Sequence, residues 1–398
     1  MIPRLKPTIG LPELKAALRI SKRRNDILTF EQGFAEMVEQ RFAVAFPYGR
    51  TGIIFLLEAL GLKDKEVICP AYTCVVVPHA IVYSCNTPVF VDCKPGEFNM
   101  DLDLAEQSIT EKTGAIIATS IFGYPVDLER LDAIKKKYPN IAIIQDCAHG
   151  YTASWNGKQV QKEGIAAIWG LNISKILCSI FGGMITTDDA LLWEKIVRMR
   201  ETKLKRPTKF KSFKRLLYLA SVYPTFWEPL YQIINKMERY GVLESFTKYY
   251  DETEIDMPSD YLTGITQLEA RVGAVNLDRY TAILRNRREA AGYYFNALDR
   301  NDAQFMLPPK VNGATYSHFV VRVADREKWL EKGIRSGVQL GWLIEYNIPE
   351  MKAYGNQNPD KFPVAAEYAR TTINLPVWGG ALLAKRVLDR LGINKKEH

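Results

Sequence analysis

The sequence lacks the groupings of cysteine and histidine that hold metal ions or form disulfide frameworks. Its six cysteines include no C-x-x-C pair, and its four histidines stand far apart in the chain. Cysteines scattered along predicted strands and their ends are typical of reduced core residues in a cytosolic protein. We therefore expect no metal site, no structural disulfide and a cytoplasmic location.

Long apolar runs are also missing. The stretch MIPRLKPTIG at the start carries prolines, a glycine and charges where a secretion signal needs an apolar run. The aromatic-rich stretch at 216–234 is interrupted by Pro224 and Pro229, whereas a membrane span needs about 20 apolar residues. These features predict neither secretion nor a transmembrane helix.

Acidic residues are absent from one part of a chain whose net charge is +8. Between Glu201 and Glu228 there is no acid, and the basic residues there are Lys203, Lys205, Arg206, Lys209, Lys211, Lys214 and Arg215. No zinc-finger spacing, basic zipper or RNA-binding signature accompanies the charge, so we expect no nucleic-acid partner. The segment 203–240 predicts a helical insertion near the mouth of the active site, with its cationic end facing an anionic ligand or, as peripheral contact, the inner face of a membrane. Burial against a partner subunit is the alternative.

What the sequence has in abundance is an alternation of short apolar runs and helical segments. With 398 residues, it is long enough for one large and one smaller domain. The expected strands are 42–46, 66–71, 88–92, 114–120, 141–145, 166–170 and 184–187. Strands that alternate with helices predict an α/β fold whose mostly parallel sheet is covered on both faces.

The pattern changes after about residue 190, which sets the expected domain organisation. We predict an N-terminal segment at 1–41 and a large domain at 42–266 that contains the helical insertion at 203–250. Residues 267–398 would form a long connecting helix and a small C-terminal α+β domain.

Lys175 is the only charged residue between Glu163 and Asp188. An ammonium group is rarely buried without a partner, and burial lowers the pKa of a lysine, which makes the free amine available as a nucleophile. The alternative is a lysine that ends a strand and extends its stem to solvent.

A second candidate is Asp146, which ends a β-branched run within the segment 140–150. His149 follows three residues later. Carboxylates at the carboxyl ends of parallel strands lie where α/β proteins bind ligands. Thr51, Tyr72, Asp146 and Lys175 would then share one rim. The alternatives are a helix cap for Asp146 and a buried, hydrogen-bonded imidazole for His149.

Taken in order, these segments resemble the DegT-type (DegT/StrS) sugar aminotransferases, pyridoxal-phosphate enzymes of the aspartate-aminotransferase fold (fold type I). The likeness runs from about residue 28 to about residue 392. Its matching segments include GRTGIIFLLEALGL, EVICPAYTC, AIVYSCNTPVFVD, IAIIQDCAHGYTASWNGKQV, SKILCSIFGGMITT and LEARVGAVNLDRY. The resemblance implies a seven-stranded large domain and a small C-terminal domain.

The resemblance also implies roles for individual residues. Lys175 would bind pyridoxal 5′-phosphate covalently and, once released, would move a proton as general base and acid. Asp146 would pair with the pyridine nitrogen and keep it protonated, so that the ring acts as an electron sink. His149 would lie near the phenolic oxygen of the cofactor.

The remaining cofactor contacts follow from the same resemblance. Arg50 and Thr51, in the GRTGI turn, would bind the phosphate, and Ser174 would contribute from another direction. The aromatic residue that stacks on the ring falls at or near Cys74, with Tyr72 as a substitute. The chain has Gly170 and Gly264 where the family has a phosphate-binding serine and a partner-subunit asparagine or arginine.

The expected protein is a homodimer that moves an amino group from an amino acid, glutamate, to a nucleotide-linked keto-sugar. This reaction would serve amino-sugar, polysaccharide or glycoconjugate biosynthesis. One alternative is a sugar dehydratase or lyase of the same fold, although the dehydrating branch has histidine where this chain has Lys175. The other is a non-catalytic regulatory or binding protein that retained the fold.

Overall fold

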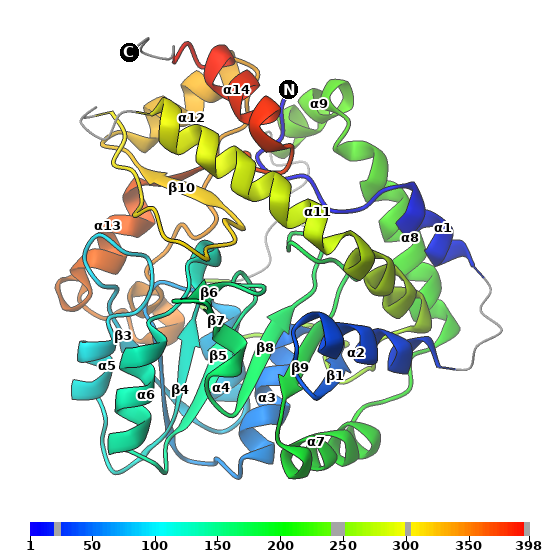
Figure 1. Ribbon diagram of the computed structural model, residues 1–398, viewed down its shortest axis with the longest axis vertical. Helices are drawn as coiled ribbons and strands as arrows, with labels where there is room; N and C mark the ends of the chain where they lie inside the picture. Colours follow the sequence, from blue (N-terminus) through cyan, green and yellow to red (C-terminus); the bar gives the residue numbers. More distant parts are fainter. Residues whose placement is uncertain (20–24, 240–250, 299–303, 394–398) are drawn as a thin grey trace.

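A seven-stranded sheet forms the centre of the large domain in the computed structural model, which describes residues 1–19, 25–239, 251–298 and 304–393 (Figure 1). The strand order is β1-β9-β8-β5-β4-β2-β3. The strands are β1 (Phe42–Phe46), β2 (Glu66–Pro70), β3 (Thr87–Val91), β4 (Thr113–Thr119), β5 (Ala142–Asp146), β8 (Ala166–Gly170) and β9 (Gly183–Thr187). Only β9 runs antiparallel to its neighbours, so the predicted mostly parallel seven-stranded sheet is confirmed.

Helices cover both faces of this sheet because neighbouring residues of each strand point to opposite sides. On β4, Ile116 and Ala118 pack in one core, whereas Ala115 and Ile117 pack in the other. The first core includes side chains of α2 (Asp26–Met37), α5 (Leu102–Gln107), α6 (Leu128–Lys137) and α11 (Gln267–Ala297). The second includes side chains of α3 (Gly49–Ala59), α4 (Val76–Tyr83) and α7 (Ala190–Lys203).

The long helix α11 connects the large domain to a small one (Figure 1). It begins with a capping box in which Thr266 and Glu269 satisfy each other's backbone N–H groups. The small domain contains the antiparallel pair β10 (Phe319–Arg322) and β11 (Thr372–Leu375), with α12 (Arg326–Arg335), α13 (Pro363–Thr371) and α14 (Gly380–Arg390). The short elements are α1 (Leu11–Leu18), β6 (Ser154–Trp155), β7 (Lys158–Gln159) and the 3-10 turns η1 (Ile121–Gly123), η2 (Val160–Lys162), η3 (Ile348–Glu350), η4 (Lys352–Tyr354) and η5 (Pro359–Lys361).

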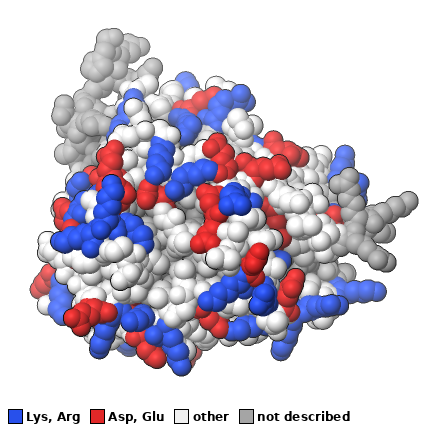
Figure 2. Space-filling model, turned by 60° about the horizontal axis from the view of Figure 1, so that its bottom comes forward, with Lys and Arg blue, Asp and Glu red and all other residues white. Residues whose placement is uncertain are grey.

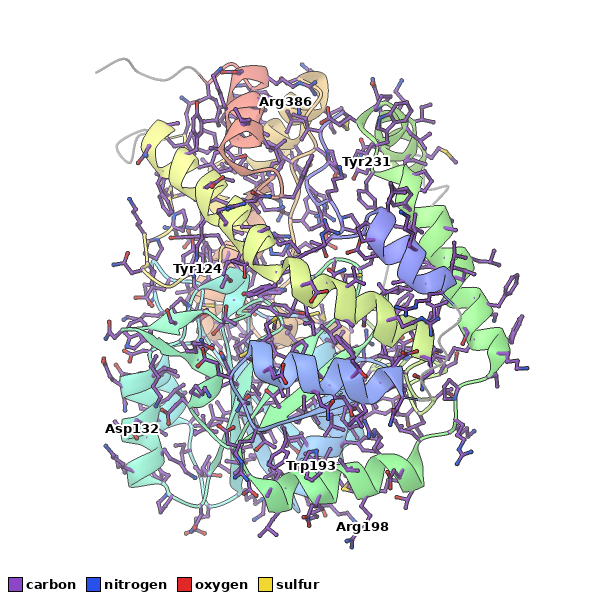
Figure 3. All side chains as sticks on the ribbon, turned by 45° about the vertical axis from the view of Figure 1, so that its right-hand side comes forward. Tyr124, Asp132, Trp193, Arg198, Tyr231 and Arg386 are labelled. Atoms are coloured by element: carbon purple, nitrogen blue, oxygen red, sulfur yellow. The ribbon has the colours of Figure 1, made fainter. Side chains whose placement is uncertain are left out.

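Two helices, α8 (Lys209–Thr225) and α9 (Glu228–Arg239), occupy most of the segment 203–250, whose last part, 240–250, lies outside the described residues. α8 packs on α1 and α11. α9 is bound to the small domain: Tyr231 donates a 2.6 Å hydrogen bond to Gln339, and Arg386 forms a 2.8 Å ion pair with Glu228. Figure 3 labels Tyr231 and Arg386 at the same end of the molecule. None of the described helices combines the length and apolar character that crossing a membrane requires.

Candidate active site

Asp146 ends β5 at the carboxyl edge of the sheet, and its side chain is only 4% exposed. Its Oδ1 accepts a 3.0 Å hydrogen bond from the Ala148 N–H, and its Oδ2 accepts a 3.2 Å bond from the Thr119 hydroxyl. Burial raises the pKa of Asp146, and the Ala148 N–H and the Lys175 ammonium partly oppose this rise. The carboxylate is thus buried with two neutral donors, and a further proton or cation beside it would be stabilised.

Lys175 lies in the turn after β8, where its backbone N–H donates a 3.0 Å hydrogen bond to the Asn172 carbonyl. Its side chain runs across the α-carbon of Gly170: a Cβ at position 170 would lie 3.2 Å from Lys175 Cε. Burial lowers the pKa of Lys175, and the opposing effects of Cys74 and Asp146 are smaller. Within the described ranges, its amine has no hydrogen bond or ion pair, so it is available to react.

His149 follows Asp146 and is buried at the same edge of the sheet. Its Nδ1 accepts a 3.3 Å hydrogen bond from the N–H of Phe122, whose ring lies parallel to the imidazole at 6.1 Å. Burial, together with the positive charge of Lys175, holds the pKa of His149 well below its ordinary value. The imidazole is therefore neutral and carries its proton on Nε2, where it can donate to an oxygen atom.

The N-terminus of α3 approaches the same site because three glycines allow close contact between backbones. A Cβ on Gly183 would lie 2.4 Å from Gly49 Cα, and a Cβ on Gly49 would lie 3.5 Å from Gly170 Cα. The first residue before the helix, Tyr48, makes no side-chain cap. The first N–H groups of α3 therefore have no side-chain acceptor from Tyr48, and a helix N-terminus of this kind favours an anion.

The two residues of α3 that are predicted to bind the phosphate differ in the burial and hydrogen bonding of their side chains. Thr51 is fully buried, and its hydroxyl donates a 3.0 Å hydrogen bond to the Tyr261 carbonyl. Arg50 is partly exposed, and its charge contributes to lowering the pKa of the neighbouring His79. Arg50 is thus the freer of the two groups to meet an anion.

The structure places the last three predicted residues in different surroundings. Cys74, just before α4, lies close enough to Lys175 to influence its pKa. The Ser174 hydroxyl donates a 2.7 Å hydrogen bond to the side chain of Asn172. Tyr72 is fully buried: its ring packs on those of Phe122 and Tyr368, and its hydroxyl bonds to Thr372 and to the Ile344 carbonyl. The contacts of Tyr72 are those of a packing residue between the large and small domains.

One further residue at the site, His318, comes from the small domain. Its ring lies 5.4 Å from that of His149, and its Nε2 is buried without a hydrogen-bond partner among the described residues. Burial, with contributions from Arg287 and Lys175, holds the pKa of His318 well below its ordinary value. His318 precedes a strand rather than following one, so the strand-end pattern that selects Asp146 gives no signal for it.

Together, these groups can serve a ligand with three different parts. A carbonyl carbon would meet the amine of Lys175, a basic ring nitrogen would meet the carboxylate of Asp146, and a phosphate would meet the N-terminus of α3 with Arg50. Three cavities of about 470, 650 and 1020 Å³ lie elsewhere, and none of the three is lined by Lys175, Asp146 or His149.

Comparison with known proteins gives one family over most of the chain. The sequence model of the DegT/DnrJ/EryC1/StrS aminotransferase family matches residues 13–220 and 227–389. A transaminase from Aneurinibacillus thermoaerophilus, named dTDP-3-amino-3,6-dideoxy-alpha-D-galactopyranose transaminase, is 27% identical over 353 residues, which cover 87% of this chain and 84% of the relative. A GDP-perosamine synthase from Escherichia coli O157:H7 is 32% identical over 46% of this chain and 50% of its own length.

Solved structures share the fold over nearly the whole chain. A putative sugar aminotransferase from Streptococcus pneumoniae, Spr1654 in its PMP-form, has a TM-score of 0.76 at 20% identity and covers 98% of both chains. DesI, solved in the presence of its TDP-sugar product, has a TM-score of 0.73 at 21% identity, over 98% of this chain and 91% of its own.

Proposed function

The chain belongs to the DegT/DnrJ/EryC1/StrS aminotransferase family, and from this premise we propose that it moves an amino group from glutamate to a nucleotide-linked keto-sugar in amino-sugar or polysaccharide biosynthesis. It is a pyridoxal-phosphate-dependent transaminase, in keeping with the PLP- and PMP-forms of its structural neighbours. The observation that carries the proposal is the amine of Lys175, which has no partner among the described residues and lies near the buried carboxylate of Asp146.

The described residues fit pyridoxal phosphate. The fit rests on a buried carboxylate with only neutral hydrogen-bond donors and on a lysine with a lowered pKa and no partner for its amine within the described ranges. When bound, the cofactor supplies an aldehyde that accepts the amine and a ring that withdraws electrons from the reacting carbon. Lys175 would hold it covalently, and Arg50 with the first N–H groups of α3 would bind its phosphate.

Asp146, Lys175 and His149 would each have a different role in the reaction. Asp146 keeps a proton on the ring nitrogen, since its own carboxylate is stabilised by that positive charge. The amine of Lys175, once free, would carry a proton between two carbons as general base and acid. His149, neutral with a proton on Nε2, would donate to the phenolic oxygen of the bound cofactor.

We propose further that the protein is a cytoplasmic homodimer with its active sites at the subunit interface. The resemblance to the sugar aminotransferase family, in which a partner-subunit residue stands where this chain has Gly264, supports this assembly. Peripheral contact of the segment 203–240 with the inner face of a membrane also remains a proposal. Size-exclusion chromatography with light scattering tests the dimer, and vesicle binding tests the membrane contact.

Two alternative functions can be compared with the proposed one through the residues that each requires at the site. A sugar dehydratase of the same fold would have histidine in place of Lys175. A non-catalytic regulatory protein is favoured by Gly170 and by the engaged hydroxyl of Thr51, because both reduce the side chains available to the phosphate.

A half-reaction separates these functions. Purified protein loaded with pyridoxal phosphate is mixed with glutamate, without any sugar, and the visible absorbance of the cofactor and the formation of 2-oxoglutarate are followed. A transaminase loses the absorbance band and forms one equivalent of 2-oxoglutarate, and the Lys175→Ala variant does neither. A protein that binds the cofactor and gives no product with glutamate or any other amino acid is not a transaminase. A panel of nucleotide keto-sugars then identifies the acceptor.

A further inference from the structure

The helices α8 and α9 expose an unusual number of large apolar side chains. Of the fifteen large hydrophobic residues that are exposed in the described part of the chain, seven lie between 210 and 237: Phe210, Phe213, Leu217, Tyr223, Trp227, Ile233 and Met237. Phe210, Phe213 and Leu217 follow one another at helical spacing and therefore share one face of α8. Phe210 is 64% exposed and Trp227 67%.

The basic residues of this segment divide between two sides of the helix. Lys211 and Arg215 point inward: Lys211 pairs with Asp260 at 3.1 Å, and Arg215 pairs with Glu269 at 2.9 Å. Their side chains are only 9% and 13% exposed. These two ion pairs fix α8 to the large domain, so its outer face is preformed.

The other basic residues stay at the surface. One of them, Lys203, pairs with Glu58, and the remaining four, Lys205, Arg206, Lys209 and Lys214, are exposed and form no ion pair within the described ranges. Lys214 lies 4.6 Å above the ring of Phe210. Lys209, Phe210, Phe213, Lys214 and Leu217 lie on α8, whereas Lys205 and Arg206 precede it and Trp227 follows it. We call the exposed surface made of these eight residues the α8 face.

The charge of the α8 face contrasts with another face of the molecule. Figure 2 shows the face at the bottom of Figure 1, where acidic and basic residues are interspersed. The sequence of the α8 face has one sign of charge only, because no acid stands between Glu201 and Glu228. A surface that carries four exposed cations beside exposed aromatic rings is complementary to an anionic one.

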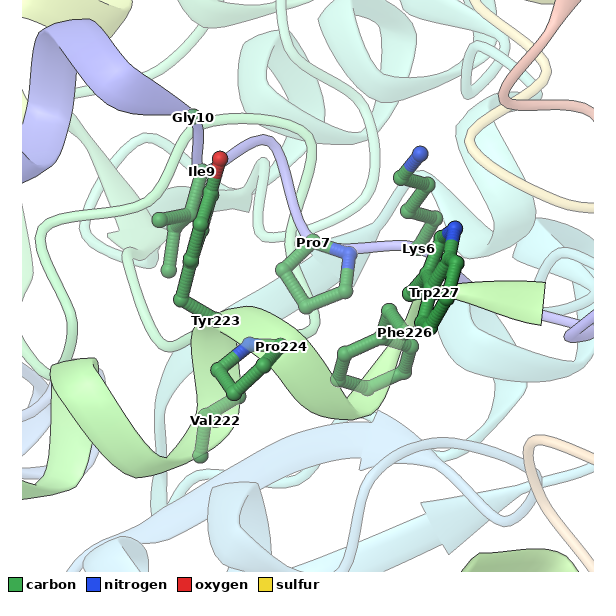
Figure 4. A pocket seen from close by; sticks show the side chains of 9 residues that line it. All are labelled: Lys6, Pro7, Ile9, Gly10, Val222, Tyr223, Pro224, Phe226 and Trp227. Atoms are coloured by element: carbon green, nitrogen blue, oxygen red, sulfur yellow. The ribbon is translucent and has the colours of Figure 1, made fainter. Parts of the chain in front are cut away.

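A cavity of about 470 Å³ adjoins this face (Figure 4). It lies between the N-terminal segment and the end of α8, and its lining includes Pro7, Ile9, Tyr223, Phe226 and Trp227. Figure 4 shows Pro7 between Tyr223 and Phe226 in this view, with the stem of Lys6 beside Trp227. Since Tyr223 and Trp227 are also exposed, apolar space continues from the surface into the cavity.

We propose that the α8 face binds an anionic phospholipid surface, with its aromatic residues in the headgroup region and an acyl chain in the adjoining cavity. This deepens the membrane contact proposed above and is independent of the transamination. A second copy of the chain is the poorer occupant, because a two-fold contact through this face would bring its four unpaired cations toward their own copies. Interfacial aromatic residues beside lysines are typical of helices that lie on membranes.

Vesicle flotation with the full-length, cofactor-loaded protein tests this surface. Vesicles of pure phosphatidylcholine are compared with vesicles that contain about one third phosphatidylglycerol. We expect binding to the anionic vesicles only. Replacing Lys205, Arg206, Lys209 and Lys214 by glutamine should lower the partition coefficient by about two to three powers of ten.

A matched control removes the same number of charges elsewhere, through glutamine at Lys63, Lys65, Lys195 and Arg198, all exposed. It should bind like the parent. Equal loss in both variants would show a non-specific charge effect, and no binding by the parent would overturn the proposal. A change of oligomeric state in the first variant without vesicle binding by the parent would assign the face to a second copy. In each case glutamate turnover reports separately on the enzyme.

Fluorescence quenching tests the cavity. Phosphatidylglycerol brominated on its acyl chains should quench the parent more than the Trp227→Phe variant, because Trp227 would contact the chain. Equal quenching in both proteins would show that no acyl chain enters the cavity.

Discussion

The side chain of Lys175 crosses Gly170 so closely that a Cβ on Gly170 would lie 3.2 Å from Lys175 Cε. The likeness to sugar aminotransferases places a phosphate-binding serine at position 170. In this chain the same space lies against the side chain of Lys175, and a Cβ on Gly49, at the N-terminus of α3, would lie 3.5 Å from Gly170 Cα. Gly170 thus lies next to both Lys175 and the turn that we propose binds the phosphate.

This contact predicts the effect of restoring the serine. Gly170→Ser should tighten the binding of pyridoxal phosphate about ten- to a hundredfold, because a hydrogen bond to a charged group contributes about 1.5–3 kcal/mol. The end of the Lys175 side chain is flexible and can shift by the few tenths of an ångström that the new Cβ requires. Titration of the apo-protein with the cofactor, followed by fluorescence, measures the change. Gly170→Ala is the control, and equal tightening by alanine would show that the hydroxyl contributes nothing.

Arg50 is expected to provide the main side-chain contact to the phosphate, since the Thr51 hydroxyl is already bonded to Tyr261. Arg50→Ala should weaken cofactor binding about ten- to a hundredfold. Arg198→Ala, at an exposed position of α7, should leave it unchanged. The same titration decides the matter, and an unchanged dissociation constant in Arg50→Ala would mean that backbone groups suffice.

Asp146 should make the stability of the apo-protein depend on pH. Burial raises the pKa of Asp146 in the folded state above its ordinary value. Its contribution to stability is therefore present below the ordinary pKa and is lost as the pH rises through the raised pKa. The apo Asp146→Asn variant should thus gain free energy of unfolding relative to the parent as the pH increases from about 4 to about 7.

Urea denaturation at several pH values measures this difference. Asp64→Asn, at an exposed turn, is the matched control and should show no such trend. The same Asp146→Asn variant should lose turnover by several powers of ten, because a neutral ring nitrogen is a poorer electron sink. Turnover equal to that of the parent would show that Asp146 has only a structural role in the turn.

Arg215 is predicted to stabilise the fold through a buried ion pair. Its partner Glu269 is 1% exposed, and burial already raises the pKa of that carboxyl group. Arg215→Met should lower the free energy of unfolding by about 3–5 kcal/mol, since it leaves a buried carboxylate without its cation. Adding Glu269→Gln should recover part of the loss. Lys385→Met, which breaks an exposed pair with Asp389, should cost less than about 1 kcal/mol, and a similar cost for Arg215→Met would contradict the burial argument.

The sheet could be predicted from the sequence because each strand is a short β-branched or apolar run between helical segments. Asp146 could be predicted in the same way, because the end of a parallel strand marks the ligand edge without any knowledge of packing. Lys175 could be selected because it is the one charge in an apolar stretch.

Other features depend on contacts between distant segments. His318 reaches His149 only because the small domain folds against the large one. The seven basic residues between Glu201 and Glu228 form a single run in the sequence, yet Lys211 and Arg215 point inward. Their partners, Asp260 and Glu269, come after the insertion in the sequence, so no local pattern could distinguish the buried cations from the exposed ones.

The central claim is that Lys175 binds the cofactor covalently, and one measurement tests it directly. The loaded protein is reduced with borohydride, digested and analysed by peptide mass spectrometry. A pyridoxyl group is expected on Lys175 and on no other lysine, and the Lys175→Ala variant is expected to remain folded and unlabelled. A pyridoxyl group on a different lysine, or an unlabelled parent protein that nevertheless transaminates, would contradict it.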